Sequence, residues 1–208
     1  CGGFNANVIR HLNEVVAEYE PKVGRENILI YPVGRKVSDA VKKMEGLTAA
    51  GDYQHMSGKP NYQEAADLAA ELMTRFASGE IQQVELLYNH FKSTSSQVLT
   101  RETYLPLDLS AGHADEKGEE QETMQADYLI EPSPEQVMEE LLPKVLRMKM
   151  YTVLLDSTAS EHAARTMAMQ IATDNANDLI QELTLIYNKS RQQAITNELL
   201  DIVGGSMS

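Results

Sequence analysis

"SPEQVMEELLPKVLRMKMYT", residues 133–152, begins the stretch that decides the fold, a helical pattern that continues to about Val203. Ser133 suits the N-cap position and Pro134 the first helical position, while Gln136 stands three residues after the cap. Together these residues predict the start of a long helix.

The predicted helix is too long to be buried by its own domain. Pro143 is its only breaking residue and is expected to kink or restart it. Residues 144–203 would be roughly 90 Å long at a rise of about 1.5 Å per residue. A globule made of the whole chain would be only about 40 Å across, from a radius of gyration near ~17 Å. We therefore expect the second half of the helix to extend beyond its own domain and to need a partner.

Apolar and small residues recur along this helix in steps of three and four, which is the spacing of a coiled-coil seam. The seam residues are Ala176, Leu179, Leu183, Ile186 and Ser190, and the small residues before them are Ala159, Ala163, Ala164, Ala168 and Ala172. No other segment of the sequence is long enough to cover the seam. We expect a partner helix, either from a segment that precedes Cys1 or from another chain, and we expect the isolated chain to self-associate.

The residues before this helix predict an α/β domain. Helical patterns at 5–20, 35–45 and 63–78 are interleaved with strand patterns at 27–33, 81–91, 96–107 and 124–132. Asn5 is expected to cap the first helix, and Pro21 with Gly24 to end it. The continuous apolar run "NILIYPV" (27–33) is typical of a strand that is buried on both faces of a parallel sheet.

Two further features complete the predicted organisation. The helix at 63–78 directs Leu68, Leu72, Met73 and Phe76 inward and ends at Gly79. The polar, acidic tract at 110–123 predicts a solvated surface loop. The predicted domains are an α/β domain over 1–132 and a long helix with a short tail over 133–208.

Composition excludes several classes of function. The 208 residues carry a net charge of -13, which argues against nucleic-acid binding because a phosphate backbone repels such a surface. With 42% hydrophobic residues and no apolar run of membrane-spanning length, the chain predicts a globular protein. A single cysteine provides neither a disulfide framework nor a cysteine-rich metal cluster.

Candidate catalytic motifs are weak. "CGGF" (1–4) lacks the spacing of a phosphate-binding loop and is interpreted as a glycine pair in a strand-to-helix turn. The five histidines show no metal-ligand spacing. "DSTASEHAAR" (156–165) contains Asp156, Ser160 and His162, but on a helix Ser160 and His162 point about 200° apart and cannot share a proton. We expect no catalytic residue, no metal and no cofactor.

Five segments, in order along the chain, carry a resemblance to a known family. They are "CGGFNANV" (1–8), "STSSQV" (93–98), "DYLIEP" (127–132), "SEHAARTMAMQIATDNANDLI" (160–180) and "LIYNKSRQQAITNELLDIVGG" (185–205). The chain resembles the gamma subunit of the rotary ATP synthase, the central shaft of its catalytic head. The resemblance covers essentially the whole chain, but the long N-terminal helix and first strand of the family are absent.

The resemblance implies a Rossmann-like, mostly parallel sheet flanked by helices, with the long C-terminal helix forming half of an antiparallel coiled coil. It implies a non-catalytic subunit that binds no nucleotide and that couples ion-driven rotation of the membrane ring to the catalytic beta subunits. The implied partners are the alpha and beta subunits, the epsilon subunit and the rotor ring of c subunits. Without the inserted cysteine pair of chloroplast members, the implied location is the cytoplasmic face of a bacterial inner membrane, as a peripheral subunit.

The resemblance also implies two contact sites. Arg191, Gln192 and Thr196 match family positions that hydrogen-bond loops of the alpha and beta subunits. Tyr128 and Glu131, with Asp127, match the contact with polar loops of the rotor ring.

Two other classes of function remain as alternatives at this point. A free-standing coiled-coil α/β adaptor would account for the long helix but not for five motifs in order. A nucleotide-binding Rossmann enzyme would require a phosphate loop and a catalytic cluster.

Overall fold

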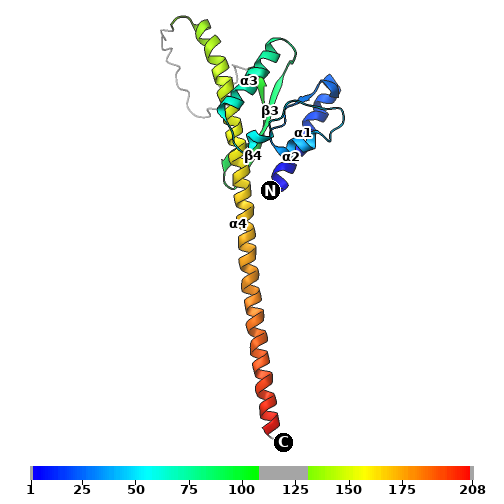
Figure 1. The fold of residues 1–208 in the computed structure, drawn as a ribbon, viewed down its shortest axis with the longest axis vertical. Helices are drawn as coiled ribbons and strands as arrows, with labels where there is room; N and C mark the ends of the chain where they lie inside the picture. The colour runs from blue at the N-terminus through cyan, green and yellow to red at the C-terminus, as the bar shows by residue number, and fades with distance from the viewer. Residues whose placement is uncertain (1, 108–130, 207–208) are drawn as a thin grey trace, which may run out of the picture. The chain divides into compact units, whose positions relative to one another are not determined.

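The computed structural model describes residues 2–107 and 131–206, and it confirms a mixed α/β protein with a long C-terminal helix (Figure 1). The elements in chain order are α1 (Gly2–Val23), η1 (Arg25–Asn27), β1 (Leu29–Ile30), α2 (Arg35–Val41), β2 (Thr48–Ala49), η2 (Gln54–Ser57), α3 (Tyr62–Ala77), β3 (Val84–Ser93), β4 (Ser96–Leu105) and α4 (Pro134–Ser206). Two compact units are distinguished, Cys1–Ala164 and Arg165–Ser208, and α4 is continuous through both.

A short parallel β–α–β unit follows α1. β1 pairs in parallel with β2, and an isolated parallel bridge joins Val33 to Tyr53. The predicted strand at 27–33 is therefore confirmed in type, but its regular part is only Leu29–Ile30. Pro32 explains the short strand, because a proline has no N–H to donate to a ladder. Both residues of β1 are half-buried, so the expectation of burial on both faces was wrong.

The second sheet is the antiparallel hairpin of β3 and β4. Its register places Asn89 opposite Leu99 and Leu86 opposite Glu102. The strands predicted at 81–91 and 96–107 are confirmed, although the first begins later and extends to Ser93. The predicted strand at 124–132 and the acidic loop at 110–123 lie almost wholly outside the described residues.

Helix α1 differs from its prediction at both ends. Asn5 lies inside the helix rather than at its cap, and Gly3 belongs to the helix rather than to a turn. Pro21 also lies inside, where it removes one hydrogen bond from the last turn only. The chain leaves the helix at Gly24, whose φ of 81° is a left-handed conformation that glycine adopts without strain.

Helix α3 confirms its predicted pattern. Asn61 caps it by accepting a hydrogen bond from the Gln63 N–H at 2.9 Å. Leu68 and Leu72 are buried, and Gly79, with φ 77°, follows the end of the helix. Met73 and Phe76 are partly buried against the same core.

The main core is formed between α3, β4, η2 and the first half of α4. Its buried residues are Met56, Ala65, Leu68, Ala69, Leu72, Tyr104, Leu105, Leu146, Met150 and Leu154. Apolar side chains from four elements are thus removed from water together, which is the main favourable contribution to the free energy of folding.

Helix α4 begins as predicted and has no break. The Gln136 N–H donates to the Ser133 hydroxyl at 3.3 Å, which confirms the predicted cap. Pro143 lies inside the helix without ending it, so a restart at this residue is not observed. Every residue from 168 to 206 is exposed, as the length argument required.

Candidate functional site

The predicted contact residues of the C-terminal helix lie together on α4. Arg191, Gln192 and Thr196 are all exposed. At about 100° per residue, Gln192 and Thr196 lie within ~40° of each other around the helix axis, and Arg191 lies ~100° from Gln192. The Thr196 hydroxyl donates to the backbone carbonyl of Gln192 at 2.9 Å, and Gln192 is itself exposed.

The Arg191 guanidinium forms no ion pair with any residue that the structure describes. A guanidinium can hold a carboxylate through two parallel hydrogen bonds, and the neighbouring amide both donates and accepts. This arrangement can bind a polar loop of another molecule.

The second unit also carries the predicted seam. Leu179, Leu183 and Ile186 have 55%, 55% and 56% of their surface exposed. Such large exposed fractions at coiled-coil spacing are unfavourable for a helix in water and indicate a surface that another helix covers.

The other predicted contact lies at the start of α4. Glu131 is exposed and lines a shallow groove of about 640 Å³ together with Val137, Leu141 and Lys144. The lining of the groove combines apolar residues with side chains of both charges. Tyr128 and Asp127 lie outside the described residues.

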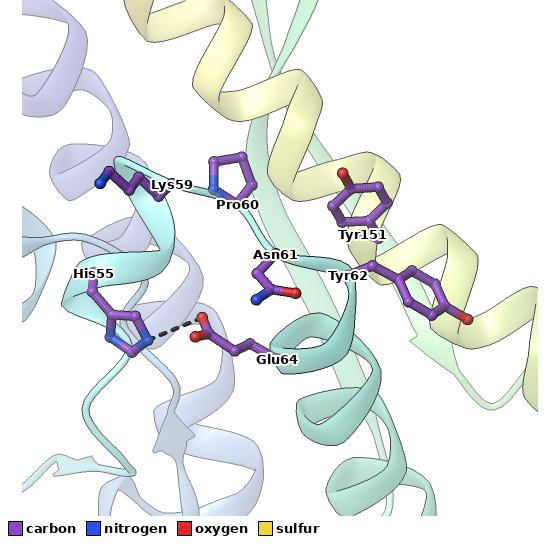
Figure 2. Close-up of a pocket in the computed structure, with 7 residues that line it drawn as sticks. All are labelled: His55, Lys59, Pro60, Asn61, Tyr62, Glu64 and Tyr151. Atoms are coloured by element: carbon purple, nitrogen blue, oxygen red, sulfur yellow. Dashed lines mark ion pairs between the residues drawn. The ribbon is translucent and has the colours of Figure 1, made fainter.

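A separate surface pocket of about 580 Å³ lies between η2, the start of α3 and α4 (Figure 2). His55 Nε2 lies 3.0 Å from Glu64 Oε2, and the rings of Tyr62 and Tyr151 meet edge to face with centroids 5.6 Å apart. These contacts fasten α3 to its neighbours and stabilise the domain, so we assign the pocket no chemistry.

The triad-like residues of "DSTASEHAAR" are used for packing. Ser160 is fully buried and donates its hydroxyl proton to the Asn89 carbonyl at 2.9 Å. Asp156 accepts from the Phe91 N–H at 2.8 Å and pairs with His90. Sequence reasoning missed these contacts. One sequence feature could have predicted the burial of Ser160. This serine follows Leu146 and Val153 in steps of seven residues, which places all three on the buried stripe of α4.

Two further findings concern the described part of the chain. Among residues 2–107 and 131–206, no three His, Cys, Asp or Glu side chains are grouped so that they could hold a metal ion. None of the helices described combines the length and the hydropathy that a membrane crossing requires.

The fold and the exposed helix define a class of protein, an α/β subunit with a stalk-like C-terminal helix. A chain from the cryo-EM structure of the Tetrahymena thermophila mitochondrial ATP synthase central stalk and c-ring shares this fold, with a TM-score of 0.52 and 23% identity. The match covers 82% of this chain and 69% of that chain, and at this identity it concerns the fold alone.

Sequence relatives identify the family. The model of the ATP synthase family matches residues 1–208. The ATP synthase gamma chain of Phocaeicola vulgatus is 69% identical over 208 residues, which are 100% of this chain and 70% of that relative. The gamma chain of Bacteroides fragilis is 59% identical, over 100% of this chain and 70% of that relative. The gamma chain of Heliobacterium modesticaldum is 38% identical, over 99% of this chain and 69% of that relative. The chain belongs to the ATP synthase gamma-chain family.

Proposed function

We propose that this chain is the central rotor shaft of an ATP synthase, coupling ion-driven rotation of a membrane ring to conformational change at catalytic beta subunits. One observation carries the proposal: α4 is a single helix of 73 residues whose last part is exposed and carries apolar residues at coiled-coil spacing. In a gamma-chain family member, this is the element that can reach from an α/β domain into a ring of other subunits. The adaptor alternative is not favoured, because the family match extends over every residue.

The contacts with the alpha and beta subunits are assigned to Arg191, Gln192 and Thr196. Their exposed hydrogen-bonding groups support this assignment. A rotating shaft must break each contact at every step. Solvent-exposed ion pairs and hydrogen bonds suit this requirement because they contribute only about 0–1 kcal/mol each.

The contact with the rotor ring of c subunits is assigned to Glu131, with Tyr128 and Asp127. The mixed apolar and charged groove beside Glu131 supports it. The remaining exposed surface of the α/β domain is the proposed contact of the epsilon subunit. In this proposal the subunit is peripheral, on the cytoplasmic face of a bacterial inner membrane.

The chain's part in the reaction is mechanical and non-catalytic. ATP is formed in the beta subunits, and this subunit contributes rotation and asymmetry. Its seam would be covered by an antiparallel partner helix.

The proposal is tested with the full-length subunit mixed with alpha and beta subunits from the same source. We expect a single complex by size-exclusion chromatography and an ATPase activity above that of alpha and beta alone. Separate elution and unchanged activity would favour the adaptor.

The contact residues are tested in the complete, membrane-embedded complex with the double variant Arg191→Ala, Gln192→Ala. We expect ATP-driven ion pumping to fall relative to ATP hydrolysis. Lys189→Ala is the matched control, because it removes an exposed cation from the same helix outside the assigned contact. Equal losses in both variants would remove the assignment.

A further inference from the structure

A group of three polar residues on α4 joins the helix to the rest of the first unit. Asp156, Thr158 and Ser160, which we call the α4 anchor, each form a hydrogen bond to an element far away in sequence. The buried positions before the anchor are apolar, namely Leu146, Met150, Val153 and Leu154. Apolar packing is non-directional, so it resists separation of two elements better than it resists rolling of one over the other. Directional hydrogen bonds supply the missing restraint.

Two members of the anchor bind one edge of β3. Asp156 accepts from the Phe91 N–H at 2.8 Å, and Ser160 donates to the Asn89 carbonyl at 2.9 Å. Asn89 and Phe91 are two residues apart on the strand, so their backbone groups point to the same side. This side is the edge that β4 does not cover, and α4 side chains satisfy its backbone groups.

The third member holds the helix from another side. The single hydroxyl proton of Thr158 is shared between the Leu154 carbonyl of its own helix, at 2.8 Å, and the Ser57 carbonyl of η2, at 3.3 Å. At about 100° per residue, Thr158 points ~160° away from both Asp156 and Ser160 around the helix axis. The helix is thus bonded on nearly opposite sides within five residues.

We infer that the α4 anchor is the rotational lock of the shaft: it prevents α4 from turning about its own axis relative to the α/β domain, so that torque passes between them. The inference deepens the proposed function and rests on it. Asp156 and Ser160 are positioning residues, since they act through the orientation of the helix and touch no substrate. A small turn of the helix about its axis lengthens or breaks the opposed hydrogen bonds, and a larger turn also exposes the buried apolar stripe to water.

The test uses the full-length subunit in the complete, membrane-embedded complex. Ser160→Ala removes the donor to Asn89 with little change in volume, and Asp156→Ala removes the acceptor of the Phe91 N–H. We expect each variant to hydrolyse ATP at the parent rate when no ion gradient opposes rotation. We expect the steady ion gradient that ATP hydrolysis can sustain to fall, because torque is then lost to turning of the helix.

Two variants separate this role from a merely structural one. Asp156→Asn keeps an oxygen that accepts from the Phe91 N–H and should restore much of the gradient lost in Asp156→Ala. Thr152→Ala removes a hydroxyl that donates only to the Met148 carbonyl of the same helix, and it should leave the gradient unchanged.

The outcomes are distinct. A parent subunit that does not assemble or pump contradicts the proposed function itself. A parent that pumps, together with Ser160→Ala and Asp156→Ala variants that sustain the parent gradient, overturns the rotational lock and leaves the shaft in place. The lock is also overturned if the ion gradient and the rate of ATP hydrolysis without an opposing gradient fall in the same proportion, because this indicates a loss of folded subunit.

Discussion

At the scale of single residues, Arg101 connects elements that are far apart in sequence. Its Nε lies 2.8 Å from Glu85 Oε2 on β3, and its Nη1 lies 2.7 Å from Glu18 Oε2 on α1. The Tyr19 hydroxyl donates to the other Glu85 oxygen at 2.8 Å. The planar guanidinium suits this role because it presents several donors in fixed directions. The sequence pattern contained no sign of the links to α1, because Tyr19 is 66 residues from Glu85 and Glu18 is 83 residues from Arg101.

We predict a pH dependence at the contact of α1 with the hairpin. Hydrogen bonds from Arg101 and then Lys22 lower the pKa of Glu18 from 4.5 to about 2. Because the folded pKa lies below the unfolded value, the stabilising contribution is present above about pH 4.5 and is lost as the pH falls through about 2. An NMR titration of the Glu18 carboxyl measures this directly. Arg101→Met should return the pKa towards 4.5, and Lys22→Met should raise it less; a parent midpoint near 4.5 would contradict the prediction.

A second prediction concerns Tyr104, whose buried hydroxyl donates to the Leu146 carbonyl at 2.9 Å. Tyr104→Phe should lower the free energy of unfolding by about 1 kcal/mol, the usual net contribution of one hydrogen bond. Urea unfolding measures the change. Tyr187→Phe, at an exposed position on α4, is the control and should change stability by less than about 0.5 kcal/mol. A Tyr104 effect no larger than this control would mean that the bond contributes nothing net.

The same tyrosine predicts a loss of stability in alkali. Burial raises the pKa of Tyr104 to about 12. Because the folded pKa is above the ordinary value of 10, its contribution is present below pH 10 and is lost as the pH rises through about 12. Urea midpoints measured across this range should fall more steeply in the parent than in Tyr104→Phe. Parallel pH profiles would argue against the burial of the phenol as the cause.

At the scale of elements, α4 contains a proline, Pro143, that the sequence predicted would kink or restart the helix. Pro143 has no N–H for the Glu139 carbonyl, yet the helix continues, and Glu139 is an exposed residue whose carbonyl water can reach. The long run of helix on both sides and the packing of Leu146 and Met150 outweigh one lost bond. A local breaker is thus overridden by tertiary contacts that lie further along the same helix.

This helix carries a prediction of its own. Pro143→Ala should restore the missing hydrogen bond and stabilise the first turns of α4, by up to about 3 kcal/mol on the propensity scale. Hydrogen exchange of the amides at 135–147 is the measurement, with slower exchange expected. Pro134→Ala is the matched control, because proline is well accommodated at the first helical position. Unchanged exchange in Pro143→Ala would show that the proline costs this helix nothing.

At the scale of the whole molecule, the described part of the second unit is a single stretch of α4 in which every residue from 168 to 206 is exposed. Its exposed apolar residues are not arranged evenly: Leu179 and Leu183 belong to the seam, whereas Leu185 points ~200° from Leu183. The seam is the surface that a helix of the full-length subunit, or a second copy, would cover.

We predict that the 208-residue chain self-associates in solution through this seam. Leu179→Gln with Leu183→Gln should shift the chain towards monomer, measured as average mass by light scattering over a range of concentrations. Leu185→Gln is the matched control, since Leu185 is even more exposed, at 71%, but lies off the seam. A monomeric parent at high concentration would contradict the prediction, and equal effects of both variants would assign association to general hydrophobicity.

Local patterns determined much of this protein. The cap at Ser133, the helical character of the residues after it, the inward face of α3 and the strand character of β3 and β4 all follow from side-chain spacing and backbone preferences of neighbouring residues. Such features are decided within a few turns of chain, where periodicity reports directly on which face is buried. The assignment of Arg191 and Gln192 as contact residues rests on the resemblance of their segment to the family.

Tertiary structure decided the rest. The strand expected at 27–33 was cut short by the one proline within it, α1 extended past its expected cap, and Asp156 and Ser160 took up the open edge of β3. The contacts of Asp156 and Ser160 depend on backbone groups that lie 65 and 71 residues away, at a distance where no periodicity connects the partners. The sequence by itself determined that a long helix forms and that its own domain cannot bury the second half. Only the folded domain determined how that helix is held, because hydrogen-bond partners are chosen by position in space after the core has packed.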